Sequence, residues 1–288
     1  MKEQSSSVTN TSFCILHPYS SIKDALKTFG FSLHQVKKHH LPIKWQNQKA
    51  VAQQEISLPF DLVNHGRINP EYVGPKPGVL FEDASVLALE KPSGIHCHPQ
   101  SYCEKDNCLC WMNASGFGHF LNVNSLQYER GLLYRLDHET SGVLIYLKNE
   151  NEYVIAREHF DGIVKQKIYM ARVSGKFDHE GLHEHSLRAA GHRGHRVIED
   201  KKDGTKVSFT IKNLHYDEVT GVSLLEVKLH TGFRHQIRAQ LAILGFPIIG
   251  DELYGGIKAE RLFLHAHKYV FEIGAKRYSL VSPCPFQV

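Results

Sequence analysis

Short segments with strand character recur along the chain after residue 78. Each is an apolar and β-branched run bounded by Gly, Pro, Asn or Asp, a pattern typical of β-strands. Helical patterns are few and do not separate every strand from the next, so the order of elements favours an α+β fold over strictly alternating α/β. The predicted strands are Val86–Glu90, Val143–Leu147, Lys167–Val173, Val207–Ile211 and Ser223–His230.

One amphipathic helix is predicted in the last quarter of the chain, from Arg234 to Leu244. Its apolar residues Ile237, Leu241 and Leu244 recur at the spacing of one helical face. Gly245 follows directly, and glycine is the residue that most often ends a helix.

A stretch rich in glycine and proline, Asn64–Gly78, interrupts the pattern of predicted elements. Such a composition is typical of a linker. A chain of 288 residues has room for one large domain and one small one. We therefore divide it into an N-terminal extension that includes the linker, residues 1–75, and a larger domain, residues 76–288.

The N-terminal extension shows a helix–helix–strand pattern, which predicts a small α+β region. Residues 1–12 are polar, and we expect them to fray. The segment that follows Ser21 has a helical pattern that ends at Gly30, and Phe31–Lys38 predicts a second helix. Ile43–Gln48 predicts a strand and a turn.

Charge and hydropathy place the chain among ordinary globular proteins. The formal net charge is +4 and the pI is about 8.6, which permits RNA binding without requiring it. No apolar run approaches the ~20 residues that span a bilayer, and the first residues lack the apolar core of a secretory signal. We expect a cytoplasmic monomer.

Four of the six cysteines cluster beside two histidines. Thiolate and imidazole are the ligands that zinc prefers, but the cluster lacks paired C-x-x-C knuckles. A zinc site and a loop of ordinary reduced thiols are both compatible with this pattern. The clustered residues are Cys97, Cys103, Cys108, Cys110, His96 and His98.

The sequence R-L-D-H-E-T-S-G places an arginine and an aspartate two residues apart, at Arg135 and Asp137. On an extended segment their side chains share a face. The buried strand Val143–Leu147 follows, and a carboxylate between aliphatic strands is unfavourable unless it is paired and hydrogen-bonded. A structural ion pair and a catalytic carboxylate both satisfy this condition.

The motif R-L-D-x-x-T-S-G closely resembles the catalytic aspartate motif of the RluA-type family of RNA pseudouridine synthases. Four further segments resemble motifs of this family in the same order, so the resemblance spans roughly residues 78–288. They are V-L-A-L-E-K-P-S-G-I-H-C-H-P (Val86–Pro99), K-I-Y-M-A-R-V-S-G (Lys167–Gly175), T-G-F-R-H-Q-I-R with the residues that follow it (Thr231–Gly255), and R-L-F-L-H-A (Arg261–Ala266).

The resemblance implies an isomerase that converts uridine to pseudouridine in rRNA or tRNA. The reaction breaks the bond between base and sugar and rejoins the ring through carbon, so it needs no redox cofactor, nucleotide or metal. The target base leaves its stack and is received by an aromatic or arginine face. The implied fold is a large mixed, mainly antiparallel sheet with flanking helices and an active-site cleft across it.

The resemblance also implies roles for four residues. Asp137 matches the catalytic aspartate, and Arg238 of H-Q-I-R matches its ion-pair partner. An arginine near an aspartate keeps the carboxylate ionised against the effect of burial. Tyr169 matches the tyrosine that stacks on the target uracil, and Arg135 is expected to contact phosphate. Lys91 is expected to be a turn residue.

Three positions depart from the family pattern. Tyr134 stands where histidine is common, His138 where arginine is usual, and Phe233 where the arginine of T-G-x-x-H-Q-I-R is usual, with Arg234 next to it. Since the aspartate is intact, these changes bear on the choice of substrate more than on activity.

A polar insert, Asp178–Lys206, carries a run of basic residues. Most charge runs are solvated loops. In a chain that resembles an RNA enzyme, we favour an arm that contacts phosphates, with Arg188, Arg193 and Arg196 as RNA-binding residues.

Two alternatives to a synthase are compatible with the sequence. One is an RNA-binding protein that keeps the synthase fold without turnover, and the other is a zinc-dependent nucleic-acid enzyme that uses the cysteine cluster. The N-terminal extension loosely resembles an alpha-L RNA-binding module in degenerate form. An extension without RNA contacts fits it equally well.

Overall fold

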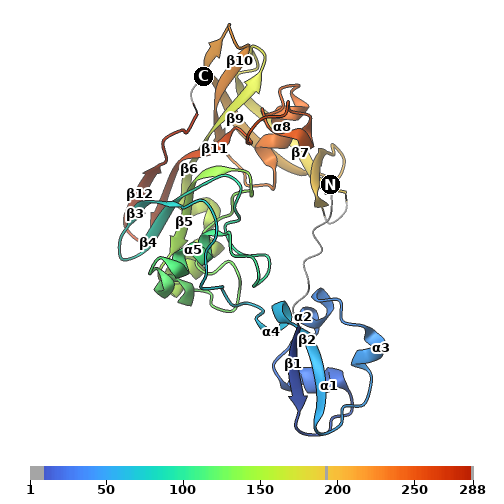
Figure 1. Cartoon of the computed structure of the whole chain (residues 1–288). Coiled ribbons are helices and arrows are strands. Elements are labelled where there is room, and N and C mark those ends of the chain that lie inside the picture. The colour runs from blue at the N-terminus through green and yellow to red at the C-terminus, as the bar shows by residue number, and fades with distance from the viewer. Residues whose placement is uncertain (1–9, 192–193, 287–288) are drawn as a thin grey trace. The chain divides into compact units, whose positions relative to one another are not determined.

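The computed structural model describes residues 10–191 and 194–286. The chain forms two compact units (Figure 1). The smaller unit comprises the chain up to Asn69 together with Pro99–Lys105, and the larger one comprises Pro70–His98 with the chain from Asp106 onward. Residues 1–9, which belong to the segment expected to fray, lie outside the described residues.

The smaller unit packs four short helices against a two-stranded antiparallel sheet. Its strands are β1 (Asn10–Ile15) and β2 (Gln54–Pro59), and its helices are α1 (Ile22–Thr28), α2 (Leu33–Lys38), α3 (Ile43–Gln46) and α4 (Phe60–Val63). The core contains Ile15, Ile22, Leu26, Leu58 and Leu62.

The first two helices confirm the prediction from the sequence, and their caps explain where they begin. The Ser21 hydroxyl accepts a hydrogen bond from Asp24 N at 3.2 Å, so it satisfies one amide of the first turn of α1. Ser32 and Gln35 form a reciprocal capping box at the start of α2.

The predicted strand at Ile43–Gln48 is wrong, because these residues begin with the helix α3. The alternation of Ile43 and Trp45 with polar residues indicated a strand. In the structure, Trp45 and Leu41 pack against the core of the unit, and the Gln46 side chain donates to the Leu41 carbonyl oxygen at 2.7 Å. Tertiary packing therefore outweighs the local pattern here.

A loop that lies later in the chain completes the smaller unit. The rings of Tyr102 and Phe60 meet edge to face with centroids 5.5 Å apart. Asn69 Nδ2 donates to the Tyr102 carbonyl oxygen at 3.2 Å, and Cys103 N donates to Asp61 Oδ1 at 3.1 Å. Pro99–Lys105 therefore packs with residues that precede β3.

The larger unit is built on one mixed sheet, which within the described residues contains ten strands. Their order is β3-β4-β5-β11-β6-β10-β9-β7-β8, with β12 paired to β11. Between these strands only β5 and β11 pair in parallel, so the predicted mixed, mainly antiparallel sheet is confirmed. The strands are β3 (Gly78–Glu82), β4 (Val86–Lys91), β5 (Ser141–Leu147), β6 (Val164–Ser174), β7 (Gly181–Ala190), β8 (Arg196–Glu199), β9 (Thr205–Asp217), β10 (Val222–Leu229), β11 (Leu264–Ile273) and β12 (Lys276–Val281).

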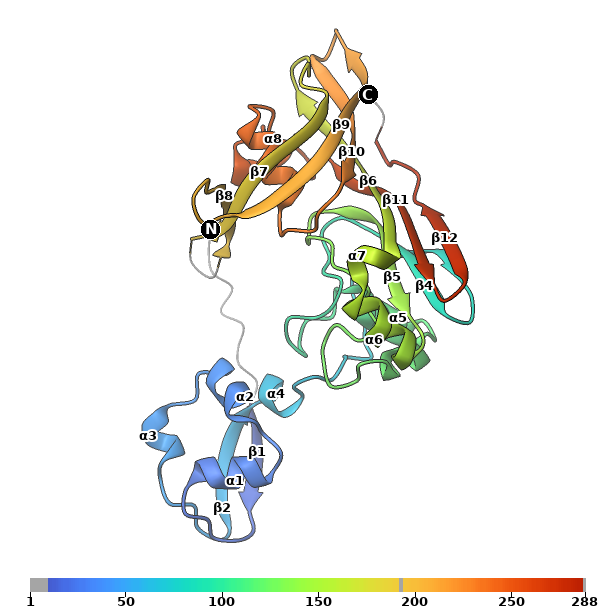
Figure 2. The same ribbon diagram turned by 180° about the vertical axis from the view of Figure 1, so that it is seen from behind.

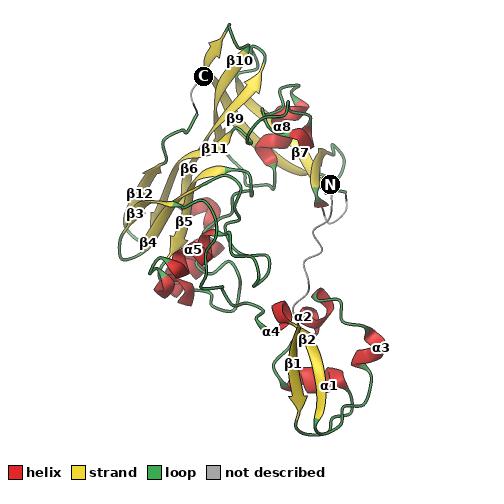
Figure 3. Cartoon of the chain, in the orientation of Figure 1, coloured by secondary structure: helices red, strands yellow, loops and turns green. Residues whose placement is uncertain are grey.

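Helices flank this sheet in two groups (Figures 2 and 3). The first group, near β4 and β5, contains α5 (Cys108–Ala114), η1 (Gly118–Asn122), α6 (Glu150–Glu158) and α7 (Phe160–Ile163). The second, near β7 and β8, contains α8 (Gln236–Ile243) and η3 (Glu252–Tyr254). Across residues 10–191 and 194–286, no helix has the length and apolar character needed to cross a membrane.

The parallel pairing of β5 with β11 depends on a glycine. Gly142 has φ +117°, and a Cβ at this position would lie 2.2 Å from the Ala266 carbonyl oxygen. Only glycine combines this backbone conformation with so close an approach. The pairing places the start of β5, directly after the segment that contains Asp137, beside β11, which in turn pairs with β6 through Ala266 and Tyr169.

The polar insert is not a loop, because β7 and β8 extend the sheet beyond β9. Leu187, Val197 and Val207 pack with Ala239 of α8 and with Tyr254 in one apolar cluster. We call β7, β8 and the residues that connect them the arm. Alternation of apolar and polar residues buries one face of the arm against α8 and leaves charged side chains on the other.

Candidate active site

The segment from Asp137 to Thr140 is held in place by the turn that follows β4. The His138 carbonyl oxygen accepts hydrogen bonds from Lys91 Nζ at 3.0 Å and from Gly94 N at 2.9 Å. Ser93 Oγ donates to the Glu139 carbonyl oxygen at 2.6 Å. The K-P-S-G turn and the aspartate segment therefore form one connected unit.

The sequence predicted Lys91 to be only a turn residue, but in the structure its side chain holds several backbone segments together. Its side chain is fully buried, and burial lowers its pKa. Its ammonium group also donates to the carbonyl oxygens of Pro92 and Ile95, at 2.9 and 2.7 Å, besides that of His138. A buried cation survives when its donors are used in this way.

Asp137 and Arg238 lie close together, although they are far apart in the sequence. Asp137 Oδ2 is 3.4 Å from Arg238 Nη1, and the Asp137 side chain is 25% exposed while that of Arg238 is 6% exposed. The carboxylate can thus reach a substrate, whereas the guanidinium lies beneath it.

Arg238 has a second and closer carboxylate partner in Asp251. Arg238 Nε and Nη2 donate to the two oxygens of Asp251 at 2.7 and 2.8 Å, and the Asp251 side chain is fully buried. Sequence reasoning did not assign Asp251 a role. Its only signal in the sequence was its place in G-D-E-L-Y-G, at the end of the longest family motif.

The charge environment keeps Arg238 protonated. Burial alone would lower its pKa, but hydrogen bonds and the charge of Asp251, together with Asp137 and Glu139, raise it above the ordinary value. Glu139 Oε2 lies 3.7 Å from Arg238 Nη1. Burial acts to raise the pKa of Glu139, but its own backbone amide and Arg238 lower it overall.

His235 also faces Asp137, and the sequence did not single it out. Its Nε2 is 3.8 Å from Asp137 Oδ1, and its Nδ1 is 3.1 Å from the Tyr254 hydroxyl. Burial lowers the pKa of His235, with the Asp137 carboxylate opposing this shift.

Tyr169 lies on β6, between β10 and β11, with its side chain largely buried. Burial raises the pKa of its hydroxyl, and the charge of Asp137 raises it further. The strand order thus brings the tyrosine near the aspartate. In the sequence, the two residues are connected only by the resemblance.

Two of the residues that depart from the family pattern, Tyr134 and Phe233, pack inside the protein. Tyr134 is buried, stacks on Tyr269 with centroids 4.1 Å apart, and donates to the Val143 carbonyl oxygen. Phe233 packs against the apolar cluster between the arm and α8. Arg234 donates to the Gly194 carbonyl oxygen at 2.8 Å.

His138 and Arg135 lie nearer the surface. His138 has a 38% exposed side chain, and its ring lies 4.6 Å from that of His96. Arg135 is exposed. Both residues flank the Asp137 position in the sequence, and both have accessible side chains.

The basic residues of the arm differ in their surroundings. Arg188 Nε donates to Asp200 Oδ2 at 2.7 Å and remains half-exposed. Arg196 lies over the Tyr254 ring, 5.4 Å from its centroid, and Arg238 lies at the same distance from that centroid. The arm therefore touches residues that surround Asp137. Arg193 lies outside the described residues.

The cysteine cluster is divided by the fold. Cys97, Cys108 and Cys110 are buried in the larger unit, whereas Cys103 is exposed and belongs to the smaller unit. Cys97 exchanges hydrogen bonds with the Leu136 backbone at 3.3 Å. In residues 10–191 and 194–286, no three His, Cys, Asp or Glu side chains gather in the manner of a metal site.

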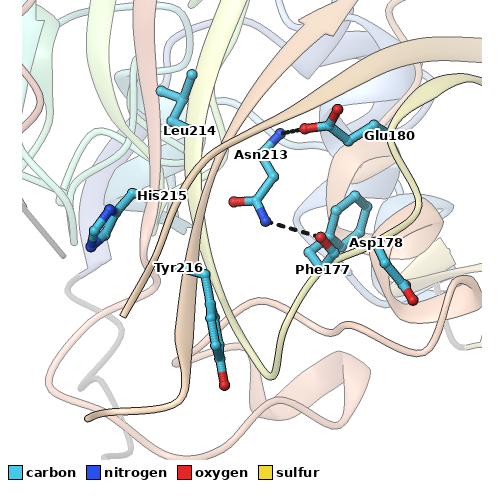
Figure 4. Close-up of a pocket in the computed structure, with 7 residues that line it drawn as sticks. All are labelled: Phe177, Asp178, Glu180, Asn213, Leu214, His215 and Tyr216. Carbon is cyan, nitrogen blue, oxygen red and sulfur yellow. Dashed lines mark hydrogen bonds between the residues drawn. The ribbon is translucent and has the colours of Figure 1, made fainter. Parts of the chain in front are cut away.

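A hollow of about 470 Å³ lies beside the start of β7, near the end of β9 that follows Ile211 (Figure 4). Asn213 lies at its centre, where its backbone amide donates to Glu180 and its side chain to the Phe177 carbonyl oxygen. Asp178 and Glu180 make its lining acidic, which does not suit a phosphate. Asp137 is not among the residues that line this hollow.

The sequence also matches a known family of proteins. Residues 85–243, just over half of the chain, match the family of RNA pseudouridylate synthases. The chain is 31% identical over 206 residues to the ribosomal large subunit pseudouridine synthase D of Borreliella burgdorferi, a match that covers 69% of this chain and 62% of that protein. It is 32% identical to an uncharacterized RNA pseudouridine synthase of Helicobacter pylori over 217 residues, 74% of this chain and 78% of that protein.

A solved structure supports the fold. The chain resembles human RNA pseudouridylate synthase domain containing 1 with a TM-score of 0.60 at 20% identity, over 74% of this chain and 85% of that one. The sheet, the ordered motifs and these relatives lead to one conclusion. The chain belongs to the RluA-type family of RNA pseudouridine synthases.

Proposed function

We propose that this chain converts uridine to pseudouridine in rRNA or tRNA, with Asp137 as the catalytic carboxylate. The observation that carries the proposal is the carboxylate itself, which is partly exposed and lies 3.4 Å from a guanidinium that is almost fully buried. A permanently charged neighbour favours the ionised carboxylate that the reaction needs.

The reaction balances without a cofactor. The bond from C1′ of ribose to N1 of uracil breaks, a bond from C1′ to C5 forms, C5 loses a proton and N1 gains one. Asp137 can act on the sugar as a nucleophile or on the sugar and base as a base. Because no electrons are gained or lost, the chain's own residues suffice.

The remaining predicted residues divide between the base and the backbone. In this proposal Tyr169, whose hydroxyl pKa is raised by burial and by the charge of Asp137, supplies the aromatic face for a flipped uracil. Arg135, with Arg188 and Arg196 of the arm, is suited to phosphates, since guanidinium groups bind them with two parallel hydrogen bonds. The basic end of α2 in the smaller unit, Lys37 and Lys38, suits an RNA backbone through the charge of its ammonium groups.

Two measurements test this function. Pseudouridines mapped in total RNA from cells with and without the gene should differ at one or more uridines, which also identifies the substrate. Restoring the gene as Asp137→Asn should leave those uridines unmodified, while RNA binding by the purified variant stays within about threefold of wild type. Turnover by the asparagine variant would remove Asp137 from the reaction.

A further inference from the structure

His235 has a backbone conformation that side chains other than glycine adopt infrequently. With φ 51° and ψ 21° it lies in the left-handed region, where non-glycine residues store strain and are found preferentially at functional sites. Its side chain does not cap α8. The Gln236 side chain, at the start of α8, reaches back to the preceding segment, where its Oε1 accepts from Phe233 N at 3.1 Å.

The conformation turns the imidazole toward two partners that belong to different segments. Nε2 faces Asp137 Oδ1 at 3.8 Å, while Nδ1 is 3.1 Å from the Tyr254 hydroxyl. That hydroxyl accepts from Val197 N on β8 at 2.8 Å. One line of polar contacts thus runs from the arm through Tyr254 and His235 to the aspartate.

Electrostatics selects the tautomer of His235. Burial keeps the imidazole neutral by lowering its pKa, and burial also raises the pKa of the Tyr254 hydroxyl, which stays protonated. If Tyr254 donates to Nδ1, the remaining imidazole proton is on Nε2 and points at a carboxylate oxygen. In the other tautomer, the Nε2 lone pair would face the carboxylate, which is repulsive.

The charged groups around His235 support this choice. Asp137 and Asp251 favour a proton on the imidazole, whereas Arg238 and Arg234 oppose the second proton that would make it a cation. The balance leaves one N–H, directed at Asp137. Arg238 Nη1 lies near Oδ2 and His235 Nε2 near Oδ1, so the two residues address the two oxygens of one carboxylate.

We propose that His235 is a positioning residue, which holds the plane of the Asp137 carboxylate through Nε2–H while Tyr254 sets its tautomer. The inference rests on the proposed function, because orientation of Asp137 has a consequence only if Asp137 reacts. At 3.8 Å the contact is an electrostatic one. Contacts of this kind shorten when a substrate closes the site.

Two substitutions at position 235 separate the two nitrogens. In His235→Asn, the amide occupies the place of Nδ1, and asparagine tolerates the left-handed backbone. In His235→Gln, the amide reaches the place of Nε2. RNA from cells that lack the gene, labelled with tritium at uridine C5, serves as the probe, because pseudouridine formation releases that tritium.

We expect His235→Asn to lower the single-turnover rate roughly 10- to 100-fold, a loss typical of a misplaced reactive group. RNA affinity should stay within about threefold, and His235→Gln should recover much of the rate. Tyr254→Phe keeps the ring and removes the hydroxyl, so it should slow the reaction as well. Combining it with His235→Asn should add little further loss, since both act through one contact.

Each opposing result has a distinct meaning. Wild-type rates in both His235→Asn and Tyr254→Phe would overturn the positioning role, as would equal losses in the Asn and Gln variants or fully additive losses in the double variant. Absence of tritium release by wild type, or release by Asp137→Asn, would instead overturn the proposed function.

Discussion

Arg238 and Asp251 form a two-point ion pair in which both partners are buried, and this pair sets the position of the guanidinium that faces Asp137. A two-point contact restricts rotation of the guanidinium plane as well as its position. Asp251 itself follows Gly250, whose φ of +84° and closeness to the Arg261 carbonyl oxygen exclude a larger residue. The position of the guanidinium that faces Asp137 thus depends on Asp251, a residue with no exposed side-chain surface.

Removing the buried partner should destabilise the protein far more than removing the exposed one. Asp251→Asn leaves Arg238 without its closest counter-charge, and breaking a buried pair typically destabilises by about 3–5 kcal/mol. Glu139→Gln is the matched control, because it removes a half-exposed carboxylate near the same guanidinium and should change stability by less than about 1 kcal/mol. Urea unfolding of both variants measures the difference, and equal losses would contradict it.

Arg238→Met should slow the reaction more than it weakens RNA binding. The substitution removes the charge that orients Asp137 and leaves Asp251 buried without its partner, so the protein should also lose stability. Single-turnover rates and RNA affinity, measured on variants shown to be folded by circular dichroism, test this expectation. If rate and affinity fall equally, Arg238 acts as a phosphate contact.

Three basic residues at the edge of the sheet, Arg188 on β7 and Lys201 and Lys202 in the turn after β8, should contribute to RNA affinity. Neutralising Arg188, Lys201 and Lys202 as glutamines should weaken binding to every RNA. It should also flatten the dependence of log affinity on log salt, by up to roughly 0.7 per lost contact on a single strand. Turnover at saturating RNA should be unchanged. An unaltered salt slope would mean that these side chains are only solvated.

Arg196→Gln is the contrasting substitution on the arm. Its side chain lies over the Tyr254 ring, so it adjoins the contact that the His235 proposal invokes. We expect it to lower turnover as well as affinity, whereas Arg188→Gln lowers affinity alone. Steady-state rates at saturating RNA separate the two, and identical behaviour would show that the Tyr254 contact of Arg196 has no consequence.

The buried His265 should make stability depend on pH. Burial lowers its pKa to about 4, and its ring nitrogens contact Ser141 Oγ at 2.8 Å and the Ser282 carbonyl oxygen at 3.2 Å. Between the ordinary pKa of about 6.5 and the folded value, the unfolded chain binds a proton that the folded chain does not. The contribution of His265 to the free energy of unfolding is therefore fully present above about pH 6.5. It decreases by about 3 kcal/mol as the pH falls to about 4.

Urea unfolding at a series of pH values tests this expectation. The difference in unfolding free energy between wild type and His265→Gln should shrink as the pH falls from about 6.5 to about 4. A difference that does not vary with pH would show that His265 titrates alike in the folded and unfolded chains.

Much of the larger unit could be predicted from the sequence because its elements are locally encoded. The apolar run of β5 and the helical spacing of α8 each contain their own signal. The predicted strands at Val86–Glu90 and Ser223–His230 are confirmed as β4 and β10 with ends shifted by one residue. The resemblance to a known family supplied Asp137, Arg238 and Tyr169, which no periodicity connects.

What the sequence missed depends on contacts made only in the folded chain. Asp251 lies 13 residues after Arg238. The two residues belong to different elements, so no helical or strand periodicity predicts their contact. His235 acquires its orientation from a strained backbone angle, for which the sequence has no marker. The arm was expected as a phosphate-contacting segment or a loop, because its charged residues obscured the alternation that forms β7 and β8.

The loop Pro99–Lys105 has a consequence for synthesis and for evolution. Its residues Tyr102 and Cys103 complete the smaller unit, but the chain must first produce β3 and β4. On the ribosome, the smaller unit therefore cannot finish packing until residue 105 has emerged. By then the first part of the larger unit, with β3 and β4, has already been synthesised. A recombination event that exchanged only the residues before β3 would separate these partners, so the smaller unit cannot be inherited as one uninterrupted cassette.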